Sequence, residues 1–149
     1  MAQSLAQIYV HLVFSTKGRA PLIAAPAITQ LHAYTAGSLA GVGCPVVSVG
    51  GVADHVHVLF ALAKTLAVSE AVKHAKIESS KWMKSEGGVA DFAWQAGYGA
   101  FSIGASQVKV VTEYIQQQEK HHAKRSFQEE FRELLKLYGV SFDEAYVWD

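Results

Sequence analysis

The stretch Asp54-His55-Val56-His57-Val58-Leu59-Phe60 decides how the rest of the chain can be arranged. It is short and nearly all apolar, which is typical of a central β-strand. Side chains alternate between the two faces of a strand, so His55 and His57 are expected on one face and the apolar side chains in a core on the other. Two imidazoles one pleat apart can bind one divalent metal ion or flank one phosphate. Most His-x-His triplets are incidental, so the pattern needs support from elsewhere in the chain.

The elements on either side of this strand follow a recognisable order. β-branched and aromatic runs predict strands, amphipathic spacing predicts helices, and Ser126 with Glu129 forms a capping box for a last helix that ends at Gly139. The other predicted elements are strands over 8–15, 46–49 and 98–103 and helices over about 26–41, 68–85 and 106–122. The second strand and the histidine strand are expected to pair as a hairpin through Gly50-Gly51. The fold class is therefore α+β: a ferredoxin-like (split βαβ) four-stranded antiparallel sheet with helices on one face, plus two further helices.

Composition limits the class of protein. Hydrophobic residues make up 50% of the chain and charged residues 17%, as expected of a globular domain. The single cysteine, Cys44, precludes an internal disulfide, and no signal peptide or membrane-spanning run is evident, so we expect a cytoplasmic protein with no membrane partner. A formal net charge of zero argues against a generic nucleic-acid coat but leaves room for a local basic patch.

The predicted helix over 106–122 carries the second group of polar side chains. Tyr114 and Gln118 are four residues apart and share a helix face, with His121 close to the same line. Val111 and Ile115 lie beside them and can hold the helix to the protein. Tyr114 and Gln118 are therefore free to point at a site.

Taken in order, the motifs identify a family. Asp54-His55-Val56-His57-Val58-Leu59, then Trp94-Gln95-Ala96-Gly97-Tyr98, then Tyr114-Ile115-x-x-Gln118 resemble the IS200/IS605-type single-tyrosine transposases of the HUH nuclease superfamily. The closely related REP-associated tyrosine transposases share the same core. The resemblance covers roughly 8–122, and we expect 1–149 to form a single transposase domain with a C-terminal helix over about 126–139.

The resemblance implies an enzyme that nicks and rejoins single-stranded DNA with hairpin ends. Tyr114 would be the nucleophile that forms a 5′-phosphotyrosine and leaves a free 3′-OH, while His55, His57 and Gln118 would hold a divalent metal ion. Two nitrogens and one amide oxygen with open positions suit Mg²⁺ or Mn²⁺ better than a closed zinc site. A homodimer is also implied, in which Tyr114 can act in trans.

Several residues have two interpretations at this stage. Asp54 either orients His55 or is a turn residue. His121 and His122 are expected to contact phosphate or to lie solvated at a helix end, and the alternative is that one of them is a substitute metal ligand. His11 is expected to be structural. Candidate DNA contacts are Lys73, Lys76, Lys81, Lys84 and His121, although a solvated face is the usual role of such lysines.

Other classes of protein remain as alternatives. A REP-associated or domesticated protein would bind a DNA hairpin without mobilising it. An RRM-like RNA-binding module would share the sheet plan but requires exposed aromatic residues where His55 and His57 stand. A metal-binding dimer without enzymatic activity is a further alternative.

Overall fold

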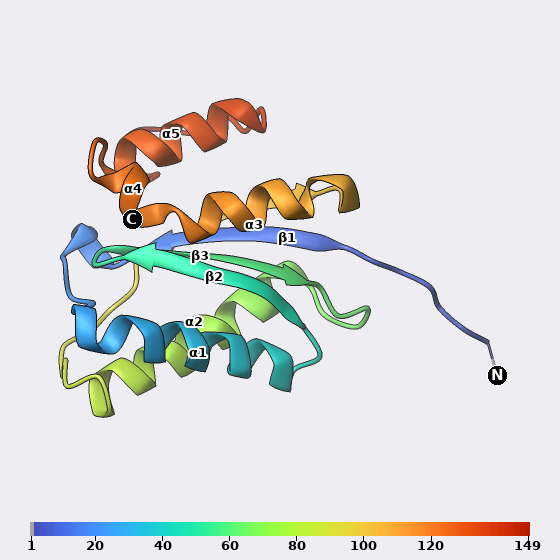
Figure 1. Ribbon diagram of the computed structural model, residues 1–149, viewed down its shortest axis with the longest axis horizontal. Helices are drawn as coiled ribbons and strands as arrows, with labels where there is room; N and C mark the ends of the chain where they lie inside the picture. Colours follow the sequence, from blue (N-terminus) through green and yellow to red (C-terminus); the bar gives the residue numbers. More distant parts are fainter. Residues whose placement is uncertain (1) are drawn as a thin grey trace.

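A four-stranded antiparallel sheet lies between two layers of helices in the computed structural model, which describes residues 2–149 (Figure 1). The strands are β1 (Tyr9–Ser15), β2 (Val46–Val52), β3 (His55–Ala61) and β4 (Gly99–Ile103). The α-helices are α1 (Ala25–Gly41), α2 (Val68–Ser85), α3 (Val108–Gln116), α4 (Gln118–His122) and α5 (Phe127–Leu137), and two short 3-10 helices, η1 (Lys17–Arg19) and η2 (Ala105–Gln107), lie between elements.

The strand order is β2-β3-β1-β4, and every neighbouring pair is antiparallel. This is the ferredoxin-like arrangement expected from the sequence, and β2 and β3 form the expected hairpin. The two inner strands, β1 and β3, pair with Ser15 opposite His55 and Val13 opposite His57. Because β3 is bonded to a strand on each side, the two histidines project from the most constrained part of the sheet.

The two faces of the sheet have different roles. One face carries Val10, Leu12, Phe14, Val56, Val58 and Phe60, all buried, and is covered by α1 and α2. Apolar burial of this extent is the main stabilising contribution to a domain of this size. The opposite face carries the histidines and is covered by α3, α4 and α5 (Figure 1). The apolar layer thus forms the core, and the other layer encloses polar side chains.

The helix predicted over 106–122 is divided into three pieces. A 3-10 turn, η2, precedes α3, and the backbone leaves helical geometry at Gln117 (φ −105°, ψ 21°) before α4 begins at Gln118. The end of α3 lies directly on β2, where a Cβ added at Gly50 would approach the Ile115 carbonyl oxygen to 2.3 Å. The absence of a side chain at Gly50 therefore permits this close contact between helix and strand.

The C-terminal helix begins as the sequence predicts. The Ser126 hydroxyl accepts a hydrogen bond from the Glu129 backbone N–H at 3.2 Å, as in an N-cap. The buried face of α5 carries Phe127, Phe131, Leu134 and Leu135 together with one carboxylate, Glu130. Among residues 2–149 no helix combines the length and the apolar character needed to cross a membrane.

Candidate active site

His55 and His57 lie side by side on β3, and neither is exposed. Each ring is held through its Nδ1 atom: His55 Nδ1 donates to Asp54 Oδ1 at 2.7 Å, and His57 Nδ1 lies 2.9 Å from His11 Nε2. Both Nε2 atoms consequently face the layer formed by α3, α4 and α5. The structure thus shows Asp54 in contact with His55, and it places His11 in the interior as the partner of His57.

Gln118 and Tyr114 reach the histidine pair from α4 and α3. The Gln118 side chain is buried, and its Oε1 lies 2.9 Å from His55 Nε2. The half-buried Tyr114 ring lies 5.8 Å from the His57 ring, measured between centroids. The helix break at Gln117 means that these side chains do not share one continuous helix face, yet both face the same site. His121 stacks on the Tyr114 ring at 4.7 Å.

A carboxylate that the sequence analysis did not identify lies at the centre of this group. Glu130 of α5 is fully buried. Its Oε1 accepts hydrogen bonds from His57 Nε2 at 2.9 Å and His122 Nε2 at 3.0 Å and lies 3.4 Å from His55 Nε2. Its Oε2 accepts a hydrogen bond from the Tyr114 hydroxyl and another from Gln118 Nε2 at 3.0 Å.

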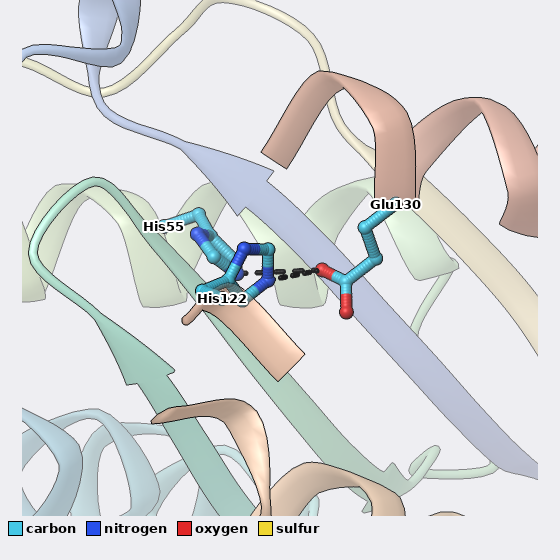
Figure 2. Close-up of side chains that lie close together, drawn as sticks. All are labelled: His55, His122 and Glu130. Carbon is cyan, nitrogen blue, oxygen red and sulfur yellow. Dashed lines mark hydrogen bonds and ion pairs between the residues drawn. The ribbon is translucent and has the colours of Figure 1, made fainter. Parts of the chain in front are cut away.

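His122 belongs to the same cluster, so the expectation that it lies solvated at a helix end is wrong. Its side chain is only 9% exposed, and α4 turns it inward because its Nδ1 donates to the Arg125 carbonyl at 2.8 Å. Figure 2 shows His55, His122 and Glu130 converging from β3, α4 and α5. The donor atoms of these three residues lie within 4.8 Å of one another, so this His-His-Glu group could bind a metal ion.

The protonation states follow from these contacts. Burial disfavours a charge on His55, but hydrogen bonds to Asp54, Glu130 and Gln118 outweigh it and raise the pKa of His55 to about 9. Burial likewise opposes the charge on Glu130, yet hydrogen bonds from the surrounding imidazoles hold the pKa of that carboxyl far below its usual range. The site therefore contains an ionised carboxylate next to a protonated imidazole.

Tyr114 is held as a neutral phenol in this arrangement. Burial raises the pKa of Tyr114, and the hydrogen bond to the Glu130 carboxylate and its negative charge raise it further. An anionic Glu130 can accept the phenolic proton in a hydrogen bond but repels a phenolate. Tyr114 is thus positioned for nucleophilic chemistry without being ionised in this state.

The candidate DNA-contacting lysines do not share one environment. Lys73, Lys81 and Lys84 are exposed and line a groove of about 580 Å³ between α2 and the loop that carries Trp94 and Tyr98. Lys76 is partly buried in the same groove. Its Nζ donates to the carbonyls of Gln95 (2.8 Å), Ala96 (3.2 Å) and Gly97 (2.6 Å), so it serves to fix that loop.

Comparison with known proteins agrees with this geometry. A family model described as "Transposase IS200 like" matches residues 4–118. The chain belongs to the IS200-like transposase family. A comparison with curated protein sequences gives no significant match.

Two solved structures share the transposase fold. A protein described as a candidate transposase from Deinococcus radiodurans R1 is 19% identical, with a TM-score of 0.62, and the alignment covers 79% of this chain and 98% of that one. A REP-associated tyrosine transposase bound to a REP hairpin is 12% identical, with a TM-score of 0.58, and the alignment covers 82% of this chain and 74% of that one. Together they confirm the α+β fold that the sequence predicts.

Proposed function

We propose that this protein is a metal-dependent transposase of the HUH type that cleaves and rejoins single-stranded DNA through a 5′-phosphotyrosine on Tyr114. The observation that carries this proposal is the meeting of the Tyr114 hydroxyl, Gln118 and the two β3 histidines around one carboxylate. Three separate segments of sequence supply these groups: β3, the region of α3 and α4, and α5.

The residues present fit a divalent cation. The buried Nε2 atoms of His55 and His57 and the amide oxygen of Gln118 lie close together in the interior beside the Glu130 carboxylate, surroundings that can hold Mg²⁺ or Mn²⁺. His55, His57 and Gln118 would hold the ion. When bound, such an ion polarises the scissile phosphate and neutralises its charge.

The chain's own residues account for the covalent steps. The Tyr114 oxygen attacks the phosphorus, the bond from phosphorus to the 3′ oxygen breaks, and a proton passes overall from the phenol to the leaving 3′ oxygen. Reversal by the 3′-OH of another DNA end transfers the strand without an external energy source. His57, fixed by His11, and His55, fixed by Asp54, provide a rigid platform against which the phosphate is placed.

The partner proposed is single-stranded DNA with hairpin ends, with the exposed Lys73, Lys81 and Lys84 and the Tyr114-stacked His121 as candidate contacts. One of the solved structures of similar fold is bound to a REP hairpin, which supports this choice. The formal net charge of zero favours local contacts over tight non-specific binding. The lack of a net positive charge also favours a second candidate function, that of a domesticated hairpin-binding protein without mobilising activity.

Covalent trapping distinguishes these two functions. Incubated with Mn²⁺ and single-stranded DNA from the flanks of its own gene, the wild-type protein should form a species stable to SDS, and mass spectrometry should locate the adduct on Tyr114. Tyr114→Phe should abolish the adduct while preserving DNA binding, because only the hydroxyl is lost. Tyr138→Phe is the matched control and should leave the adduct unchanged. An adduct on another tyrosine, or cleavage undiminished in Tyr114→Phe, would refute the proposed mechanism.

A further inference from the structure

Glu130 is a polar residue of the site that neither the sequence motifs nor the family match explains. It lies on α5, beyond residues 4–118 that the family model matches. Its neighbours on the buried face of the helix, Phe127, Phe131 and Leu134, are apolar. Burying an ionised carboxylate among apolar side chains costs free energy unless hydrogen bonds and opposite charges compensate it. The presence of Glu130 on this face therefore points to a specific role.

The two oxygens of Glu130 face different partners. Oε1 lies against the imidazole nitrogens, 2.9 Å from His57 Nε2, 3.0 Å from His122 Nε2 and 3.4 Å from His55 Nε2. Oε2 lies on the other side, where it accepts hydrogen bonds from the Tyr114 hydroxyl and from Gln118 Nε2. One carboxylate therefore joins the histidine cluster to the tyrosine.

We propose that Glu130 is a metal ligand through Oε1 and, through Oε2, the group that holds the Tyr114 hydroxyl beside the metal site. The inference rests on the proposed function and adds a residue that the family motifs do not supply. It makes α5 part of the active site, because the carboxylate reaches the β3 histidines from the helical layer that covers their face of the sheet.

The chemistry of the ligands supports this assignment. Two imidazoles and an amide form a neutral set, whereas Mg²⁺ and Mn²⁺ prefer oxygen donors and above all carboxylates. Glu130 supplies the anionic oxygen that His55, His57 and Gln118 lack. The metal site would then have its nucleophile attached by a hydrogen bond to one of its own ligands, which shortens the path from phenol to phosphate.

A purely structural role is the alternative, in which Glu130 only anchors α5 through ion pairs with the histidines. The two roles predict different effects of removing the charge. A structural anchor contributes to stability with or without metal, whereas a ligand contributes to metal affinity. Glu133, on the same helix but exposed and paired with Arg125, provides a matched control for charge and position.

The test measures Mn²⁺ binding to the full chain by the electron paramagnetic resonance signal of free Mn²⁺, without DNA. Glu130→Gln keeps the shape but removes the charge, and its dissociation constant should rise about tenfold or more, the size expected for a change in a metal's ligands or their immediate partners. Glu133→Gln should stay within about twofold of the wild type. In wild-type protein, Mn²⁺ should shift a carboxylate stretching band in the infrared difference spectrum, and this shift should be absent from Glu130→Gln.

The outcomes separate this inference from the proposed function. If His57→Ala loses Mn²⁺ binding but Glu130→Gln retains wild-type affinity, Glu130 is not a ligand and the transposase mechanism stands. If Glu130→Gln does not fold, two other measurements test the ligand role. The wild type should show the infrared shift, and Glu130→Asp, which keeps the charge on a shorter side chain, should bind Mn²⁺ more weakly than the wild type. A wild-type spectrum without any carboxylate shift, with Mn²⁺ bound, would overturn the ligand role.

Discussion

The two β3 histidines are chemically unequal because different residues stand behind them. An anionic carboxylate, Asp54, contacts His55, whereas a neutral imidazole, His11, contacts His57. Burial lowers the pKa of His11 to about 3, so that ring carries no charge. Hydrogen bonds raise the pKa of His55 and burial lowers the pKa of His57, so His55 is stabilised as a cation and His57 as a neutral ring.

This asymmetry predicts a maximum in the stability of the metal-free protein near neutral pH. The pKa of His55 is raised from 6.5 to about 9. The contribution of this shift to the free energy of unfolding is therefore fully present below pH 6.5 and is lost as the pH rises through 9. At 1.36 kcal/mol per unit the loss is about 3 kcal/mol. His11 and His32 have pKa values lowered to about 3 and 4, so stability should also fall as the pH drops below 6.5.

Urea unfolding in EDTA at pH 5, 6.5 and 9 measures these changes. Asp54→Asn is the matched variant, because it weakens the acceptor that holds the proton on His55. The free energy of unfolding of this variant should therefore fall less between pH 6.5 and 9 than that of the wild type. A free energy of unfolding that rises from pH 6.5 to 9 would contradict the assignment of charge to His55.

At the same scale, the sequence predicted the side chains that belong to short motifs and missed those that do not. His55 and His57 alternate along one strand and therefore share a face, and Tyr114 and Gln118 are four residues apart in the sequence, although the break at Gln117 places them on two helices. Glu130 reaches the site only because α5 folds back over the sheet, a long-range contact that no local spacing encodes. One signal was available: Glu130 lies between Phe127 and Phe131 in the apolar stripe of an otherwise amphipathic helix.

At the scale of elements, α2 shows that lysines on one helix can have separate roles. Lys73 and Lys84 are exposed on the groove, whereas Lys76 is held by backbone carbonyls and lies over the Phe14 and Tyr98 rings. The sequence places all of them within a similar sector of the helix. Only the position of the 95–97 loop, set by tertiary contacts, distinguishes a lysine that fixes a loop from one that is free to meet phosphate.

Two lysine variants should therefore behave differently. If Lys73 and Lys84 contact phosphates, the double Ala variant should weaken binding to single-stranded DNA and reduce the slope of log K against log salt by about 1.4. Lys76→Ala should instead lower the free energy of unfolding by about 0.5–1.5 kcal/mol, because the hydrogen bonds to the partly exposed loop carbonyls are lost. Binding isotherms over a salt series and urea unfolding are the measurements.

Lys136→Ala, an exposed lysine on α5, is the control for a general loss of charge. An unchanged salt slope in the Lys73/Lys84 variant would assign these lysines to an ordinary solvated face. An unchanged stability of Lys76→Ala would show that the loop does not depend on it.

The helix break at Gln117 is a second feature at this scale that the sequence did not reveal. No proline or glycine lies between residues 106 and 122, so local propensity favours one continuous helix. The break arises where the end of α3 meets β2 at Gly50 and α4 turns Gln118 and His122 inward. Tertiary contact overrides propensity here, and the result is a site with more inward-facing side chains than a straight helix provides.

At the scale of the whole molecule, one chain supplies every group of the proposed active site. Tyr114 lies beside His57 of its own chain, with Glu130 between them. The family resemblance implies a homodimer, and β2 and β4 are the sheet edges through which a second copy could pair. We therefore propose that any dimer contains two sites, each complete within one protomer.

Mixing two inactive variants tests this arrangement. Tyr114→Phe and His57→Ala, co-expressed so that mixed dimers form, should give no covalent adduct with DNA, because neither protomer contains an intact site. If tyrosine and histidines act across the dimer, one site of each mixed dimer is intact and adduct formation returns. Sedimentation velocity at micromolar concentration shows whether dimers are present, and a wild-type mixture serves as the positive control.

The depth of the site has a kinetic consequence. His55, His57, Gln118 and Glu130 are at most 1% exposed, so a phosphate cannot touch them while α4 and α5 lie on the sheet as they do here. On the proposed function, substrate capture then includes a step in which these two helices open and close again, so that Gln118 and Glu130 return to the metal site, and motions of this kind take microseconds to milliseconds. At high DNA concentration the rate of engagement is consequently limited by an internal rearrangement of the protein, and further substrate no longer accelerates it.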